Sequence, residues 1–180
     1  MKPPAGEEAD MNENLQSIGK AKRILFCTDF SENADFAFGF AVEAAVQHPG
    51  STLYLLNVIP EPEAQFWKTY LYEVDDVDAK AKRDIDARIA ETYRPHVPEG
   101  VDFRVEIRIG KDYMTILEFA DEQDVDMIVM GRQGHSELET VLFGNVTEKV
   151  TRKADCTVLV VPLSYEERLR RRKGSRTGEG

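Results

Sequence analysis

Five short apolar runs, separated by segments with helical periodicity, constrain the fold of this chain more than any other feature. The runs occupy residues 23–28, 52–59, 101–109, 125–130 and 156–161. Short apolar runs of this kind are typical of strands buried in a parallel sheet. Strands that alternate with helices form a mostly parallel sheet with helices on both faces. The pattern therefore predicts a single-domain, five-stranded α/β fold of the Rossmann-like type.

Local signals place the helices between these strands. Ser31 can cap a helix that runs to about Gln47, because its side chain can accept a hydrogen bond from an unpaired backbone N–H. Asp112 is expected to cap the third helix, with Met114 facing the core, and residues 145–153 form the fourth helix. The third strand alternates apolar and polar residues, which is compatible with an outer position in the sheet.

The charge of the 180-residue chain is unevenly spread around a formal net value of −10. Residues 21–163 hold 15 basic and 26 acidic side chains, whereas residues 164–180 hold 6 basic and 3 acidic ones. An acidic body repels phosphates, so the composition argues against a nucleic-acid-binding protein. Residues 1–20 show no periodicity, and we expect them and the basic segment 164–180 to be disordered tails of one domain over 21–163.

Two further signals concern the location of the protein. No apolar run approaches the roughly 20 residues that a membrane helix needs, so we expect no membrane span. The first twenty residues have no apolar signal core, and the cysteines, Cys27 and Cys156, fit no zinc or redox spacing. We therefore expect a cytoplasmic protein with two buried, reduced thiols.

Three glycines after the fourth predicted strand form the most informative motif. Gly131 and Gly134 follow that strand directly, and Gly144 stands where the fourth helix begins. Glycine lets the backbone approach a ligand closely, and the start of a helix presents unpaired N–H groups and a positive dipole end. Together they predict a cradle for phosphates, while a loop with ordinary turn glycines remains the alternative.

Four segments then resemble the universal stress protein family, in the right order and together covering residues 22–162. They read RILFCTDFSENADFAFGFA, LYLLNVIP, DVDMIVMGRQG and FGNVTEKVTRKADCTVLVVP. The glycine spacing matches the ATP-binding pattern of this family, Gly-x2-Gly-x9-Gly-[Ser/Thr], except that Asn145 replaces the Ser or Thr. Asn keeps a hydrogen-bond donor in its amide group. The resemblance implies the adenine-nucleotide alpha hydrolase-like variety of the fold, and ATP with Mg²⁺ as the ligand.

The resemblance also implies where the nucleotide lies. Asp29 would lie beside the adenosine, the backbone of Val58 would meet the adenine, and Met130 and Gly131 would lie near the ribose and phosphates. The residues that the resemblance assigns to the nucleotide are Thr28, Asp29, Val58, Met130, Gly131, Arg132, Gly134, Gly144, Asn145, Val146 and Thr147. We expect no dedicated metal site, because Mg²⁺ bound to a triphosphate keeps several waters and needs few protein ligands.

The final predicted strand is expected at an edge of the sheet, and bare edges invite pairing with another chain. In the resembling family, similar last strands pair across a two-fold axis, which implies a homodimer with an interface around residues 158–163. Two other functions stay open: a nucleotide-free regulatory dimer that acts through protein contacts, and a weak ATPase. For the ATPase we find no convincing general base, since Glu137, Glu139 and Glu148 are near the glycine loop in sequence only.

Overall fold

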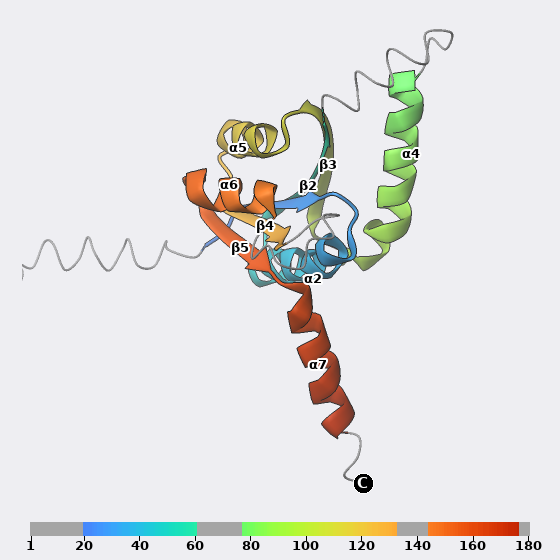
Figure 1. Ribbon diagram of the computed structural model, residues 1–180, viewed down its shortest axis with the longest axis vertical. Helices are drawn as coiled ribbons and strands as arrows, with labels where there is room; N and C mark the ends of the chain where they lie inside the picture. Colours follow the sequence, from blue (N-terminus) through green and yellow to red (C-terminus); the bar gives the residue numbers. More distant parts are fainter. Residues whose placement is uncertain (1–19, 61–76, 133–143, 177–180) are drawn as a thin grey trace, which may run out of the picture.

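The computed structural model describes residues 20–60, 77–132 and 144–176. Gly134, Glu137, Glu139 and the N-terminal segment 1–19 lie outside the described residues. Strands and helices alternate as predicted along the chain (Figure 1). The elements are β1 (Arg23–Thr28), α2 (Glu32–Gln47), β2 (Thr52–Pro60), α4 (Val77–Thr92), η1 (Arg94–His96), β3 (Asp102–Gly110), α5 (Asp112–Glu122), β4 (Met127–Gly131), α6 (Asn145–Lys153), β5 (Thr157–Val161) and α7 (Leu163–Arg176).

The five strands form one parallel sheet in the order β3-β2-β1-β4-β5. The register is continuous across its centre, where Leu25 of β1 lies between Tyr54 of β2 and Ile128 of β4. This confirms the parallel α/β fold, with the third and fifth strands at the two edges. The chain builds outward from β1 to β3 and then returns to β4, so the strand order reverses between β1 and β4. Ligands of such sheets bind outside the carboxyl ends of the strands at this reversal.

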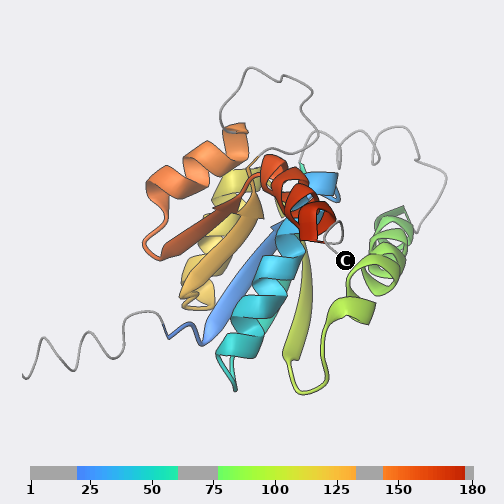
Figure 2. The same cartoon turned by 90° about the horizontal axis from the view of Figure 1, so that it is seen from below.

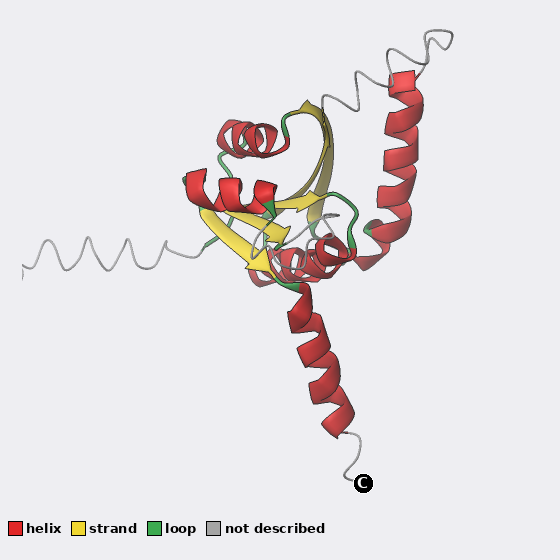
Figure 3. Ribbon diagram, in the orientation of Figure 1, coloured by secondary structure: helices red, strands yellow, loops and turns green. Residues whose placement is uncertain are grey.

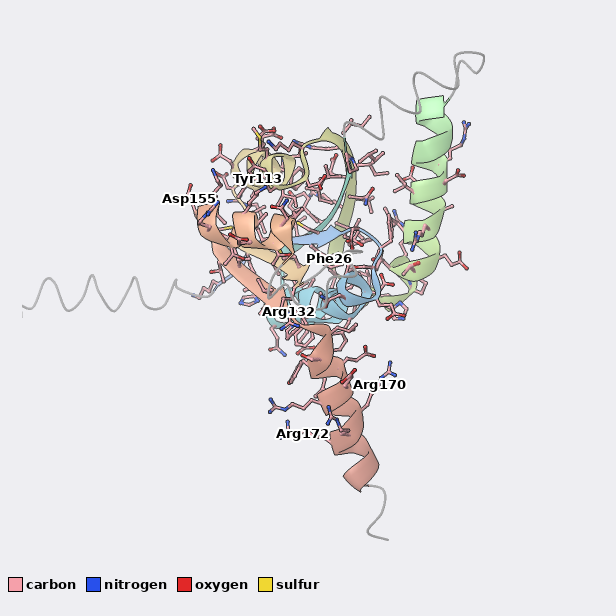
Figure 4. The ribbon with its side chains drawn as sticks, viewed as in Figure 1. Phe26, Tyr113, Arg132, Asp155, Arg170 and Arg172 are labelled. Atoms are coloured by element: carbon pink, nitrogen blue, oxygen red, sulfur yellow. The ribbon has the colours of Figure 1, made fainter. Side chains whose placement is uncertain are left out.

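Helices cover both faces of the sheet (Figures 1 and 3), with α2 and the end of α4 on one face and α5 and α6 on the other. Successive strand residues point to opposite faces, so neighbours in one strand enter different cores. Phe26, labelled in Figure 4, enters the core on the α2 side, where its ring centroid lies 5.0 Å from that of Phe38. Leu25 enters the opposite core, which also contains Phe119 of α5. Full burial of such a side chain stabilises the fold by about 1.5–3 kcal/mol.

The start of α2 agrees with the sequence analysis, whereas the start of α5 differs by one residue. Ser31 caps α2, since its side chain accepts a hydrogen bond from the N–H of Ala34. In α5, Lys111 takes the N-cap position, and Asp112 is the first helical residue. The prediction that Met114 faces the core is wrong, because its side chain is 43% exposed.

The rotation of α5 brings one of its side chains into close contact with the end of β3. A Cβ at Gly110 would overlap Oγ1 of Thr115, so the end of the strand lies directly against the Thr115 side of the helix. The stripe that faces the sheet is therefore Thr115, Ile116, Phe119 and Ala120. This stripe leaves Met114 on the solvent side.

The basic C-terminal segment also differs from our expectation, because Leu163–Arg176 forms helix α7 instead of a disordered tail. Tyr165 anchors its first turn against α2, with ring centroids 6.4 Å from Phe36 and 6.0 Å from Phe40. From this anchor α7 extends away from the sheet in Figure 1, and Figure 2, the view from below, shows it foreshortened in front of the sheet. Glutamates and arginines one turn apart form exposed ion pairs along the helix, and such pairs favour helix formation. Among the described helices, none combines the length and apolar character needed to cross a bilayer.

Candidate functional site

The turn after β1 presents Asp29 at the carboxyl edge of the sheet. Oδ1 of Asp29 accepts hydrogen bonds from the backbone N–H of Ser31, at 3.1 Å, and from its hydroxyl group, at 2.6 Å. Phe30 has a φ of 60°, which is unfavourable for a residue with a side chain. The guanidinium of Arg88 holds this conformation, because it lies 4.4 Å from the Phe30 ring centroid and donates to the Phe30 carbonyl. Asp29 is thereby exposed but fixed to the start of α2.

A chain of hydrogen bonds beneath this turn fixes the end of β1. The N–H of Phe30 donates to Oγ1 of Thr28 at 2.9 Å. The hydroxyl groups of Thr28 and Tyr93 share a hydrogen bond of 2.6 Å. The Tyr93 hydroxyl donates in turn to Oδ1 of Asp35 at 2.5 Å. Burial, reinforced by the bond to Asp35, raises the pKa of Tyr93, so its hydroxyl remains protonated and can donate. The Thr28 hydroxyl is therefore engaged inside the protein and supports the turn from below.

The neighbouring strand β2 contributes a second support and an open backbone edge. Nδ2 of the buried Asn57 donates to the carbonyl of Thr28 at 2.9 Å, a link that the sequence analysis did not anticipate. The pairing of β1 with β2 ends at Thr28 and Asn57. Val58 continues to pair with Arg108 on the β3 side, while the described part of the chain places no strand opposite Val58 on the β1 side. One side of the Val58 backbone is therefore open at the carboxyl edge of the sheet.

Gly131, at the end of β4, allows three elements to meet. A Cβ at this position would lie 3.0 Å from the carbonyl carbon of Asn33 and 3.1 Å from its oxygen, so a larger residue would displace the start of α2. The carbonyl of Gly131 accepts a hydrogen bond of 3.0 Å from Oγ1 of Thr147 in α6. Met130 beside it is buried in the core, with 5% of its surface exposed. Gly131 thus brings α2, β4 and α6 together at the reversal point.

The first turn of α6 faces the same edge. Gly144 is the N-cap residue, and its N–H donates to the carbonyl of Arg132 at 2.9 Å. Arg132 in turn donates its backbone N–H to the carbonyl of Val161 in β5, and Figure 4 shows the residue beside the start of α7. Asn145 is exposed and Val146 half-buried, and the first N–H groups of a helix have no partner within it. The helix start therefore offers backbone donors to an anion.

A cavity of about 110 Å³ adjoins this helix start. It lies between the first turns of α5 and α6, and its lining residues are Lys111, Asp112, Tyr113, Asn145, Val146 and Lys149. Burial raises the pKa of Asp112, and the charge of Asp29 raises it further. Because Asn145 and Val146 line the cavity, it continues directly from the start of α6. In sequence, Lys111 and Asp112 after a strand-ending glycine were the available signal for it.

The structure thus assembles most of the residues that the sequence analysis assigned to a ligand. Asp29, Val58, Gly131, Gly144, Asn145 and Val146 lie at one edge of the sheet, while the side chains of Thr28, Met130 and Thr147 are buried beneath it. Arg132 contributes its backbone, and Gly134 is outside the described residues. Within the described ranges, no three His, Cys, Asp or Glu residues gather as metal ligands would.

Comparison with protein families gives a match to the model of the Universal stress protein family over residues 20–162. One relative, the universal stress protein MJ0577 of Methanocaldococcus jannaschii, is 30% identical over 154 residues, which cover 78% of this chain and 94% of the relative. A putative universal stress protein of Staphylococcus haemolyticus is 32% identical over 145 residues, covering 78% of this chain and 84% of that protein.

Comparison with solved structures also finds similarity to universal stress proteins. The structure of MJ0577 matches 79% of this chain and 96% of its own, with a TM-score of 0.64 and 30% identity. The universal stress protein UspA of Lactobacillus plantarum has a TM-score of 0.62 and 26% identity, and the match covers 78% of this chain and 97% of that one. The similarity therefore spans the sheet and its covering helices in nearly the whole length of each neighbour.

Proposed function

Because this chain belongs to the universal stress protein family, we propose that it binds ATP at the carboxyl ends of β1 and β4 and acts as a nucleotide-responsive stress or signalling protein. One observation carries the proposal. The N-terminal turn of α6 lies against Gly131 at the point where the strand order reverses, on the same edge as Asp29. A helix start next to a strand end of this kind is a site for phosphates.

Each part of the edge suits one part of the nucleotide. The Asp29 carboxylate can accept a hydrogen bond from a ribose hydroxyl or a base amine, and the open backbone edge at Val58 can pair with the adenine. The backbone donors of Asn145, Val146 and Thr147 suit the phosphates. Asn145 replaces the Ser or Thr of the family pattern, but it retains a donor and is exposed at the first helical position.

The site can be tested at Asn145 with substitutions that preserve the helix. Asn145→Asp places a negative charge where the phosphates would bind, although an acidic residue in the first turn of a helix is favourable for folding. We expect isothermal titration with ATP and Mg²⁺ to show binding to the wild type and a loss of about tenfold or more in Asn145→Asp. Asn145→Ser, the control, restores the family pattern and should bind ATP at least as tightly as the wild type.

The outcome separates this proposal from the alternatives. If the wild type shows no heat with ATP, and protein denatured after purification releases no adenine nucleotide, the site does not bind ATP. The chain would then act as a nucleotide-free regulatory protein through its protein contacts. Phosphate release by the wild type well above that of Asn145→Asp would instead support a weak ATPase.

We further propose that the protein forms a homodimer through β5. The exposed positions of β5 are Thr157 and Leu159, and the strand contains no charged residue. The opposite edge strand, β3, carries Asp102, Arg104 and Glu106 on exposed positions, and charged side chains are the usual protection of an edge against pairing. The charge pattern therefore favours β5 as the edge that pairs with a second copy.

The oligomeric state of two lysine variants tests this interface. Leu159→Lys introduces a charge on β5, and light scattering after gel filtration should report a monomer. Ile109→Lys makes the same change at an exposed position of β3 and should leave the dimer intact. A monomeric wild type, or a dimer that survives Leu159→Lys, would contradict the proposed interface.

A further inference from the structure

Three lysines lie near the ring of Tyr113, a residue of α5 that Figure 4 labels. Their ammonium nitrogens lie 5.4 Å, 4.9 Å and 5.9 Å from the ring centroid, for Lys111, Lys149 and Lys153 respectively. None of the three forms an ion pair with a carboxylate in the described parts of the chain. Since residues 21–163 carry an excess of acidic side chains, this lysine cluster is a local positive charge within an acidic body.

The position of Lys111 is unfavourable for folding alone. It is the N-cap residue of α5, where the helix dipole disfavours a positive charge, and its side chain makes no capping hydrogen bond. Its contact with the Tyr113 ring offsets part of this cost, and features that break a local rule are expected at functional sites. Lys149 is half-buried on the facing helix, so the two charges converge across the space between α5 and α6.

The cavity described above lies at the point of convergence. Lys111 and Lys149 line it together with Asn145 and Val146 of the first turn of α6, whereas Lys153 is not among its lining residues. Asn145 and Val146 thus belong both to the helix start beside Gly131 and to the cavity wall. An anionic group that extends past the start of α6 would enter this cavity.

Resting on the proposed nucleotide site, we propose that the cavity holds the terminal phosphates of the bound nucleotide. Lys149 and Lys111 are then the residues that make the chain prefer a nucleoside triphosphate to a monophosphate. Each lysine brings an ammonium donor to a phosphate oxygen, and the contact exists only when the phosphate chain is long enough to reach the cavity.

Asp112 fits this assignment when the triphosphate carries Mg²⁺. Its Oδ1 atom is buried without a hydrogen-bond partner among the described residues, and a carboxylate in this place would repel a bare phosphate. Carboxylate oxygen is the ligand type that Mg²⁺ prefers, directly or through a water. The donor set of the cavity, two lysines and one carboxylate, therefore suits a metal-bound phosphate end.

Substitutions by methionine test the assignment, because methionine keeps the length of the apolar stem and removes the charge. ATP with Mg²⁺, and AMP, are titrated into the wild type, Lys149→Met and the matched control Lys153→Met, which removes the same charge one turn further along α6. We expect Lys149→Met to lose about tenfold or more in affinity for ATP and less than about twofold for AMP. Lys153→Met should change either affinity by less than about threefold, and Lys111→Met should resemble Lys149→Met.

Three results would overturn the assignment while leaving the proposed nucleotide site in place. The wild type could bind AMP as tightly as ATP, Lys149→Met could keep the wild-type preference, or Lys153→Met could lose as much affinity for ATP as Lys149→Met. The last result would show a general effect of charge. Absence of binding to both nucleotides in the wild type would instead refute the nucleotide site itself.

Discussion

Removal of a single oxygen atom at Tyr93 tests the hydrogen-bond chain that supports the end of β1. Tyr93 is 1% exposed, and its ring contacts Phe38 and Phe26 at centroid distances of 4.7 Å and 5.5 Å. Tyr93→Phe keeps these ring contacts and removes only the hydroxyl that links Thr28 to Asp35. The variant therefore isolates the contribution of the hydrogen bonds from that of the packing.

The expected cost follows from the exposure of the two partners. Asp35 is exposed, so water can replace the lost bond to its carboxylate at little cost. Thr28 is 6% exposed, and its O–H group loses its acceptor in a buried place, although its oxygen still accepts from the N–H of Phe30. A buried polar group without a partner costs about 1–3 kcal/mol, and we expect Tyr93→Phe to lower the free energy of unfolding by about 2 kcal/mol. For a chain of this length, that corresponds to a decrease of about 4–8 °C in melting temperature.

Urea denaturation followed by far-ultraviolet circular dichroism measures this cost. Tyr165→Phe is the matched control, because the Tyr165 ring packs on α2 while its hydroxyl makes no described hydrogen bond. The control should change the free energy of unfolding by less than about 0.5 kcal/mol. If Tyr93→Phe were as stable as Tyr165→Phe, the reasoning about the buried Thr28 hydroxyl would be refuted.

A double-mutant cycle measures how much of the lost stability comes from the hydrogen bond between the Thr28 and Tyr93 hydroxyl groups. Thr28→Val removes the other hydroxyl of the buried pair, and replacement of both partners by apolar groups is far less costly than loss of one partner. We therefore expect the double variant Thr28→Val with Tyr93→Phe to lose less stability than the sum of the two single variants, by about 1 kcal/mol. Strict additivity would show that the two hydroxyls do not interact.

Three further predictions concern other parts of the molecule. Gly131→Ala should lower the free energy of unfolding by about 1–3 kcal/mol, because its Cβ would meet the backbone of Asn33; an unchanged urea midpoint would contradict this. Because folding raises the pKa of Asp112, the folded state favours its protonated carboxyl. The resulting contribution to stability is fully present below the unfolded pKa and is lost as the pH rises through the folded pKa. Asp112→Asn should therefore melt at a higher temperature than the wild type at pH 7, with an advantage that shrinks toward pH 4, and a constant difference would refute the assignment. Tyr165→Ala removes the anchor of α7, so trypsin should cleave α7 faster while the melting temperature of the domain changes little; an unchanged cleavage rate would show that other contacts hold α7.

Sequence patterns were reliable where the determining interactions are local. The apolar runs defined all five strands, and residues 145–153 formed a helix with those bounds, because periodicity acts over a few neighbouring residues. Ser31 capped α2 for the same reason, since the donor of Ala34 is only three residues away. The edge position of the last strand also followed, and with it the edge that we propose for dimerisation.

The sequence predicted which residues belong to the candidate site, but it did not predict the hydrogen bonds and contacts that hold them in place. The glycine spacing predicted that the end of β4 and the start of α6 belong to the site. The hydrogen bond between Thr28 and Tyr93 joins residues 65 positions apart, and no local sequence pattern predicts such a bond. In α5, Met114 is exposed and Lys111 lines the cavity, while Thr115 packs closely against Gly110, and no local pattern indicated this rotation of the helix. The docking of α7 on α2 likewise rests on an aromatic contact between Phe40 and Tyr165, which are far apart in sequence.

The sequence by itself determined that this chain would alternate strands and helices in a parallel sheet, because hydrophobic periodicity is read over a single turn or strand. Only the tertiary structure decided which strands are neighbours, that Gly131 must approach Asn33, and that two lysines from different helices share one cavity. These contacts join residues far apart in the chain, and their energies exist only after the sheet has brought the segments together.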